Sequence, residues 1–558
     1  MNKIFSSLLI VAAAATQLSA QDETLTKTVE VLRAYEPTIP EAYKINPIPR
    51  IDDTASVQTT FTYPLRQVRP LTEEFLINPI APARVQRDYY SEANERNRGY
   101  LRMGFGLKPS TLIDAYYGSE RAQKFVWDVF ANHYGNFGKV KNEAKEKVPN
   151  LSMRNELGGS GKYNFTHGAL LGTAGFQRHD LRLYGYETDF FTLNDYKDLP
   201  NDEKRLAYNH TYFSLDYKSL ALPDSTWEIS GTFNFYDYRR KVRNDLTEDA
   251  LEFSLFVKKR ATPTTTFGVA INTDVYLRSR WGVSNSNTVF SIAPEAVEKR
   301  DSWEVSAKLN FTLDNVSGKL KPYLYPVLNL TAQLADNMFF PYVELSGEHG
   351  VNTYKSLTIE NPYTLNIDLR NTRKSIALKG GMKGHVGSML GYDVNLSYAF
   401  VNDMHFFVDS YLLPNYFVVL YDDVKLFTFG GTMRFQPMRP LELKLGLRYD
   451  QYTMDPLEEA YNRPSLGMKL EAKYNLWNKL NLYANARVMG GYKVMTIVDE
   501  QGATIDDGNK KAGFDLSIGA DYRFVDRSSV FVQINNLTNS RYQLYNNYPS
   551  YGLNLMLG

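Results

Sequence analysis

The chain has 558 residues, and its 63 lysines and arginines almost balance its 62 aspartates and glutamates. A charged fraction of 22 % excludes a bundle of membrane helices, because each spanning helix needs about 20 nearly uncharged residues in a row. A net charge of +1 argues against a nucleic-acid-binding protein, and the absence of cysteine excludes disulfides, thiolate metal sites and a cysteine nucleophile.

Residues 1–20 have the pattern of a signal peptide. Lys3 precedes the apolar run Ile4–Ala15, and Leu18-Ser19-Ala20 supplies the small residues of a cleavage site. The apolar run is too short to cross a bilayer as a helix. We therefore expect an exported protein whose mature chain begins at Gln21.

Residues 21–99 form a Pro-rich segment that the sequence predicts to be extended. Eight of the 24 prolines lie between Pro37 and Pro82, and proline interrupts both helices and the interior of sheets. The segment is either an unstructured linker or a strap that binds a periplasmic protein or folds into a lumen. The sequence does not separate these alternatives.

From residue 100 onward, apolar and polar residues alternate along runs that turns separate. The clearest runs cover residues 441–449, 466–476, 480–488 and 514–524. They reach nine to eleven residues, the length that a tilted strand needs to cross a bilayer, whereas strands of a soluble sandwich usually have about five or six. Aromatic residues lie at the ends of these runs, where rings prefer the interface of lipid and water, and this accounts for the 40 tyrosines.

Ten short turns alternate with eleven longer connections, which predicts 22 strands within a range of 20 to 24. The count splits residues 101–117 at Lys108-Pro109 and keeps residues 392–410 as one bent strand. Both ends of the barrel then lie on the short-turn side. We predict an all-β fold, a transmembrane antiparallel β-barrel over residues 100–558 that follows the Pro-rich segment.

No pattern of catalytic or metal-binding residues stands out. The seven histidines have no spacing of two or four residues, so we expect no zinc site. The run Gly158-Gly159-Ser160-Gly161-Lys162 fits neither a nucleophile elbow, which needs Gly at 162, nor a phosphate loop, which needs Ser or Thr at Tyr163. We therefore expect no enzyme, no cofactor and no metal.

The long connections hold the candidate ligand-binding residues. Tyr186, Tyr196 and Tyr545 can stack on a sugar or planar ligand, or simply extend the interfacial aromatic girdle. Asp506 and Asp507 can attract a cationic ligand or only keep an exposed loop soluble. Charged residues on the polar faces of the strands are expected to line a wet lumen.

The last strands resemble the final hairpin of TonB-dependent receptors. Asn536-Leu537-Thr538-Asn539 with Tyr542 matches the motif of the family's penultimate strand, and Tyr548-Pro549-Ser550-Tyr551-Gly552 matches the loop before its last strand. The resemblance implies a 22-stranded barrel in the outer membrane of a Gram-negative bacterium that takes part in transporting a ligand.

Two features differ from the family. The segment 21–99 stands where the family has a longer, folded plug domain, so we expect no folded plug. The sequence stops at Leu555-Met556-Leu557-Gly558 without the aromatic end typical of such barrels, so we expect that it is truncated there.

Three functions therefore remain open. The first is transport, in which outer loops capture a ligand and the strap or a partner protein blocks the lumen. The second is a passive, porin-like channel, and the third is a non-transporting scaffold for envelope or secretion proteins. The expected partners are outer-membrane lipid, an unidentified small ligand, and a TonB-type energiser or other periplasmic protein at residues 21–99, but no nucleic acid.

Overall fold

The structure is a computed structural model. It describes residues 98–119, 124–142, 144–186, 192–219, 226–241, 246–280, 282–334, 338–366, 369–410, 415–455, 457–497 and 504–558. The expected signal peptide and residues 21–97 of the Pro-rich segment lie outside the described residues.

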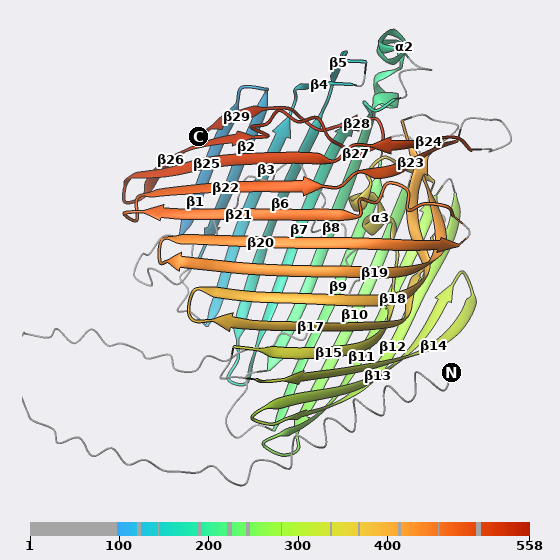
Figure 1. The fold of residues 1–558 in the computed structure, drawn as a ribbon, viewed down its shortest axis with the longest axis vertical. Coiled ribbons are helices and arrows are strands. Elements are labelled where there is room, and N and C mark those ends of the chain that lie inside the picture. The colour runs from blue at the N-terminus through green and yellow to red at the C-terminus, as the bar shows by residue number, and fades with distance from the viewer. Residues whose placement is uncertain are drawn as a thin grey trace, which may run out of the picture. The chain divides into compact units, whose positions relative to one another are not determined.

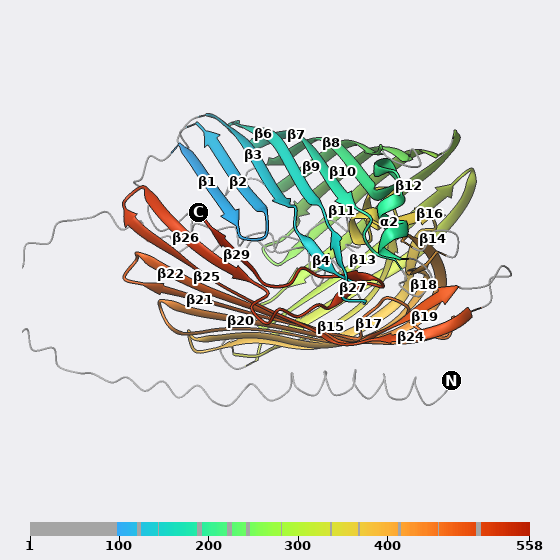
Figure 2. The same cartoon turned by 90° about the horizontal axis from the view of Figure 1, so that it is seen from above.

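Antiparallel strands close into one barrel (Figure 1, Figure 2). In the described ranges, the barrel has the 22 strands that the sequence predicts, and each one pairs with its neighbour along the chain. The strands are β1 (Gly99–Gly106), β2 (Ser110–Gly118), β3 (Phe125–Asn136), β6 (Ser152–Asn164), β7 (Gly168–Arg182), β8 (Arg205–Ser219), β9 (Trp227–Arg240), β10 (Leu246–Arg260), β11 (Thr265–Arg280), β12 (Val283–Lys299), β13 (Trp303–Val316), β14 (Lys319–Ala332), β15 (Phe340–Gly350), β17 (Thr372–Val386), β18 (Leu390–Asp409), β19 (Phe417–Met438), β20 (Leu441–Asp455), β21 (Leu466–Leu476), β22 (Leu480–Met489), β25 (Gly513–Val525), β26 (Ser528–Asn535) and β29 (Asn554–Leu557).

The short last strand closes the ring. β29 pairs with β26 along residues 532–535 and with β1 at Phe105 and Gly106. Met556 of β29 is 1 % exposed and packs against Phe531 and Leu112. The seam between the first and last strands thus has a small apolar core on its inner side.

The connections define two ends of the barrel. The end of the barrel that holds the ten expected short turns is called the short-turn end. Seven of these turns join consecutive strands in the described residues, and the other three, at residues 119–123, 223–225 and 335–337, lie wholly or mostly outside them. The opposite end, the loop end, has eleven connections. Two of these differ from the expectation of a longer loop: only residues 281 and 282 separate β11 from β12, and β13 and β14 are joined only by Ser317 and Gly318. Both have positive φ, which gives a tight hairpin turn.

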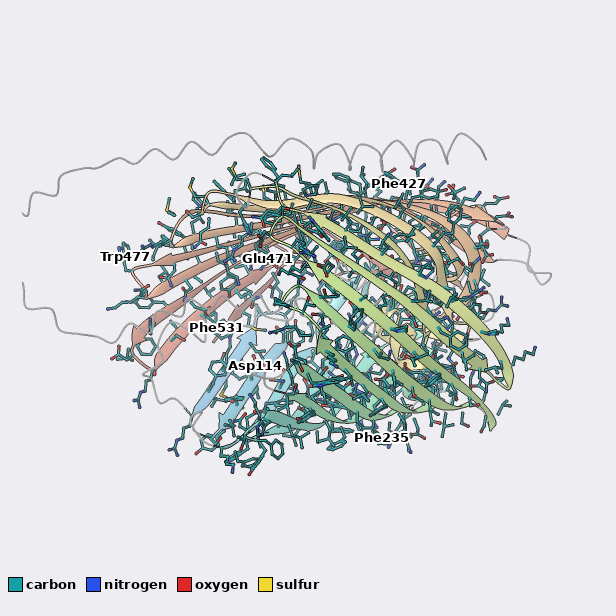
Figure 3. All side chains as sticks on the ribbon, turned by 90° about the horizontal axis from the view of Figure 1, so that it is seen from below. Asp114, Phe235, Phe427, Glu471, Trp477 and Phe531 are labelled. Carbon is teal, nitrogen blue, oxygen red and sulfur yellow. The ribbon has the colours of Figure 1, made fainter. Side chains whose placement is uncertain are left out.

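The alternation of residue types places one face toward lipid and the other toward the lumen. Phe235 and Phe427 lie on the outer surface, whereas Asp114 and Glu471 point into the interior (Figure 3). Large exposed apolar side chains occur on nearly all barrel strands, as expected of a surface that contacts lipid. Trp477, 82 % exposed in the turn between β21 and β22, lies at the short-turn end.

All remaining elements lie in the loop-end connections. They are hairpin β4 (Lys139–Lys141) and β5 (Lys147–Pro149), α2 (Leu193–Asp198), the 3-10 helix η2 (Asn201–Lys204), α3 (Tyr354–Glu360), β16 (Thr364–Asn366), hairpin β23 (Tyr492–Ile497) and β24 (Thr504–Lys510), and hairpin β27 (Gln543–Tyr545) and β28 (Tyr548–Pro549). The side chains of Thr192 and Thr353 cap the N-termini of α2 and α3. No described helix is both long enough and apolar enough to cross a membrane.

A tyrosine-rich cluster, called the loop-end core here, joins the loop-end connections to the barrel wall. Its tyrosines are Tyr184, Tyr186, Tyr196, Tyr208, Tyr236, Tyr238, Tyr276, Tyr354, Tyr363, Tyr416, Tyr545 and Tyr548. The rings of Tyr363 and Tyr548 stack with centroids 3.6 Å apart, and the Tyr548 hydroxyl donates a hydrogen bond of 2.6 Å to the carbonyl oxygen of Asn415. Part of the tyrosine excess therefore serves packing inside the barrel mouth rather than the lipid interface.

Candidate functional site

Helix α3 lies inside the ring of strands, and a buried carboxylate holds its N-terminal end (Figure 1). Glu248 of β10 is fully buried, and its carboxylate accepts hydrogen bonds from the backbone N–H groups of Tyr354 (2.7 Å) and Lys355 (3.2 Å). It also accepts from the Tyr236 hydroxyl at 2.9 Å and from Nε of Arg278 at 3.0 Å. Arg278 is itself buried, so this end of the helix is fixed to β10 and β11 by a fully bonded ion pair.

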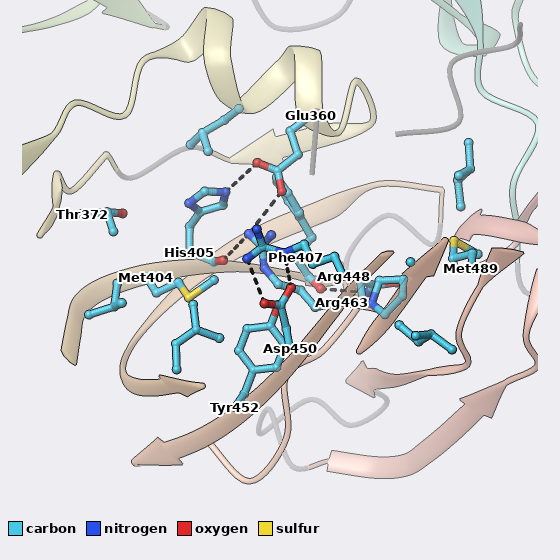
Figure 4. Close-up of a pocket in the computed structure, with 18 of the residues that line it drawn as sticks. Glu360, Thr372, Met404, His405, Phe407, Arg448, Asp450, Tyr452, Arg463 and Met489 are labelled. Atoms are coloured by element: carbon cyan, nitrogen blue, oxygen red, sulfur yellow. Dashed lines mark hydrogen bonds and ion pairs between the residues drawn. The ribbon is translucent and has the colours of Figure 1, made fainter. Parts of the chain in front are cut away.

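A second buried ion pair holds the C-terminal end of α3 (Figure 4). Nε2 of His405 on β18 lies 2.7 Å from Oε2 of Glu360, and a terminal guanidinium nitrogen of Arg463 lies 3.1 Å from Oε1. The same guanidinium donates to the carbonyl oxygen of His405 at 2.8 Å. All three side chains are less than one-tenth exposed. Because β10 and β18 are not neighbours in the sheet, α3 connects two separate parts of the wall.

A cavity lies beside α3 on the lumen side. It has a volume of about 1530 Å³, including space open to solvent, and residues from α3, β17 to β22 and the β26–β29 connection line it. Its larger apolar residues are Val351, Leu357, Val401, Met404, Phe407, Leu426, Tyr452, Leu466, Met468, Val488, Met489, Leu544 and Tyr545. A solvent-open hollow with an apolar lining and a few charged groups is the usual form of a small-molecule site.

The cavity wall has more positively charged groups than negatively charged ones. Five are cationic and two are carboxylates: Lys374, Arg448, Arg463, Lys469 and Arg487 against Glu360 and Asp450. The Arg448 guanidinium donates to both carboxylate oxygens of Asp450, at 2.6 and 2.8 Å, and the Thr428 hydroxyl donates to one of them at 2.6 Å. This bidentate pair fixes both side chains on the β20 wall.

Several polar atoms of the cavity have no hydrogen-bond partner in the described structure. They are Nε of Arg463, Nδ1 of His405 and Oδ1 of Asn462, and all three residues are less than one-tenth exposed. Nε of Arg463 is a donor, whereas Oδ1 of Asn462 is an acceptor. A buried polar atom without a partner is rare in folded proteins, and such a group usually indicates a bound molecule or a functional role.

The five ligand-binding candidates from the sequence fall in three places. Tyr545 lines the cavity and is 8 % exposed. Tyr186 and Tyr196 stack on each other, with centroids 5.5 Å apart, in the loop-end core. Burial raises the pKa of each to about 12. Asp506 and Asp507 lie on β24. A ligand role for any of the five stays a prediction.

The groups that hold α3 were not among the sequence candidates. Glu360 ends the short helix α3 and Arg463 lies in the connection between β20 and β21, and neither segment has a sequence period that shows which way a side chain points. His405 had appeared only as one of seven unpaired histidines. Arg448 and Arg487 were recognised as lumen-facing from the alternation alone, which does not reveal what they contact. Among the described residues, no three His, Asp or Glu side chains are grouped as a metal site would require.

Comparisons with known proteins support the barrel through structure alone. No protein-family model matches the sequence, and no curated protein matches it. The FrpB iron transporter from Neisseria meningitidis superposes with a TM-score of 0.65 at 12 % identity, covering 82 % of this chain and 80 % of that chain.

Two further solved structures give similar values. The ferric enterobactin receptor PfeA from Pseudomonas aeruginosa has a TM-score of 0.63, and the copper transporter OprC has 0.61, each at 11 % identity. Each match covers 82 % of this chain and 79 % of the other. The fold expected from the C-terminal hairpin is thus confirmed: the chain has a 22-stranded antiparallel barrel with the same fold as these three proteins.

Proposed function

We propose that this protein resides in the outer membrane of a Gram-negative bacterium and carries a small ligand through its lumen, with the cavity beside α3 as the binding site. The observation that carries the proposal is the attachment of α3 at both ends to the barrel wall, next to a solvent-open cavity. A scaffold that docks only through its outer surface needs neither a lined cavity nor a helix held inside the lumen.

The helix and the loop-end core act in this proposal as the barrier at the outer end. Their apolar and ionic contacts narrow the lumen where a ligand would enter, and movement of α3 away from β10 or β18 would widen it. A periplasmic energiser of the TonB type, or another protein that binds residues 21–97, would be the source of that movement.

Ion conductance of the purified full chain in planar bilayers tests the proposal. We expect small or rare current steps for the unaltered protein and larger ones for a Glu248→Gln, Glu360→Gln double variant, because each change removes one charge that holds α3. Large, equal conductance in both proteins would favour a passive channel. No conductance in either would favour a scaffold. The heat-modifiable mobility of the folded barrel on gels serves as the folding control for both proteins.

A further inference from the structure

The balance of charge in the cavity indicates which ligands it can hold. Lys374 and Lys469 have carboxylate partners outside the cavity, Glu348 at 3.1 Å and Glu471 at 2.5 Å. Arg448 and Arg463 are paired with the two carboxylates of the cavity wall. Arg487 is the cation of this wall that makes no ion pair within the described residues. From this, and resting on the proposed function, we propose that the cavity binds an organic anion that has an apolar body.

Arg463 holds a second positive charge in a fixed position in the cavity wall. Its terminal nitrogen is held by Glu360 and by the His405 carbonyl, while its Nε–H has no acceptor in the described structure. This Nε atom is itself buried, so Arg463 contributes the positive charge of its guanidinium to the cavity wall. Because the guanidinium is already held in place, little conformational entropy is lost when the ligand binds.

The same contacts disfavour a cation. Asp450 already accepts three hydrogen bonds, two from Arg448 and one from Thr428. Glu360 is already paired with Arg463 and hydrogen-bonded to His405. A cationic ligand would therefore have to displace an arginine from a carboxylate, whereas an anion meets guanidinium groups that are already in position.

The apolar part of the ligand would lie against methionine and aromatic side chains. Met404, Met489, Leu544 and Tyr545 line the cavity. Methionine is flexible and polarisable, so it adapts to rings of different shape, and the Tyr545 ring offers a flat apolar surface. A small aromatic or branched aliphatic acid fits this lining better than a fully hydrated ion such as phosphate.

Calorimetric titration of the full chain in detergent tests this inference with two matched probes. Naphthalene-2-sulfonate carries a permanent negative charge, and naphthalene-2-sulfonamide has the same ring but is neutral at pH 7. We expect the sulfonate to bind at least about tenfold more tightly after subtraction of a micelle blank, as charge-assisted hydrogen bonds imply. Equal affinity for both probes, or no binding of the sulfonate, would overturn the inference.

Two variants locate the binding site. Arg487→Gln removes the cation of the cavity wall that has no carboxylate partner, and we expect it to weaken sulfonate binding about tenfold or more without changing sulfonamide binding. Lys473→Gln makes the same change of charge on the polar face of β21, outside the cavity lining, and should leave both affinities unchanged. Equal losses in the two variants would overturn the site, because they would indicate only general attraction to a basic lumen.

The result separates this inference from the proposed function. Selective binding that depends on Arg487, combined with no conductance in any variant, would support the anion site while contradicting transport. Large conductance steps after release of α3, combined with equal affinity for both probes, would support the pathway while contradicting the anion site.

Discussion

Nε2 of His405 lies 2.7 Å from a carboxylate oxygen of Glu360, and this contact attaches the C-terminal end of α3 to β18. An ionised carboxylate has no proton to donate, so Nε2 of His405 carries the hydrogen in this pair. With Arg463 as its second partner, Glu360 joins three segments that are far apart in the chain.

The first prediction concerns the mobility of α3. The chain has no native cysteine, so a Val351→Cys variant places a single thiol in the cavity wall just before α3. We expect a charged thiol reagent to modify it about tenfold faster when Glu360→Gln is added, because a hydrogen bond to a charged group contributes about 1.5–3 kcal/mol. Glu442→Gln changes a lumen carboxylate that pairs with Arg434 instead, and serves as the control. If Glu360→Gln and Glu442→Gln gave equal rates of thiol modification, this would contradict the attachment of α3 through Glu360.

The second prediction concerns ion selectivity. Asp450→Asn removes one of the two carboxylates of the cavity wall and leaves Arg448 without a charged partner. In a KCl gradient, we expect the reversal potential to shift toward that of chloride, because the lumen becomes more positive. Asp526→Asn makes the same change in the exposed turn between β25 and β26. The account fails on this point if both variants shift the potential equally.

The third prediction concerns pH. Burial raises the pKa of Tyr186 to about 12, from an unfolded value of about 10. The neutral form therefore stabilises the loop-end core fully below pH 10, and this contribution is lost as the pH rises through 12. The tyrosinate absorbance of Tyr186 is the difference between the titration of the unaltered protein and that of a Tyr186→Phe variant. This difference should appear near pH 12. Its appearance near pH 10 would indicate an exposed ring instead.

The fourth prediction concerns the seam. Met556 is 1 % exposed between Phe531 and Leu112, and truncation of a buried methionine costs about 2–5 kcal/mol. We expect Met556→Ala to lower the free energy of unfolding by an amount at the lower end of this range, because β29 is short and can relax. It should lower the temperature at which the folded band disappears on gels. Leu557→Ala, at a residue that is 53 % exposed, should change that temperature little, and an equal effect of the two variants would contradict a packed seam.

The barrel could be predicted from the sequence because its two environments alternate along every strand. Lipid on one side and a wet lumen on the other select apolar and polar residues in turn, and this pattern predicted the 22 strands. Residues 392–410, expected to form one bent strand, lie in β18 apart from Ser410, and the register of β18 shifts between Val401 and Met404. Most strands extend further than the expected nine to eleven residues, whereas β21 and β22 keep 11 and 10. β19 has 22, because its loop-end part packs on the loop-end core.

The site could not be predicted in the same way. Glu360, His405 and Arg463 come from three separate parts of the chain, and alternation shows which face a strand residue occupies but not what lies across from it. Helix α3 has only seven residues, too few for a helical period to be recognised. Tyr186 and Tyr196 were correctly placed in a long connection, but their burial depends on how that connection folds against Val140 and Val148.

Uptake of naphthalene-2-sulfonate by proteoliposomes is the most direct test of a transport pathway through the cavity. The probe keeps its charge and does not cross lipid readily. We expect vesicles that hold the Glu248→Gln, Glu360→Gln variant to take it up faster than vesicles with the unaltered protein, and we expect Arg487→Gln to slow this uptake. Uptake at the rate of protein-free vesicles in every case would contradict the account.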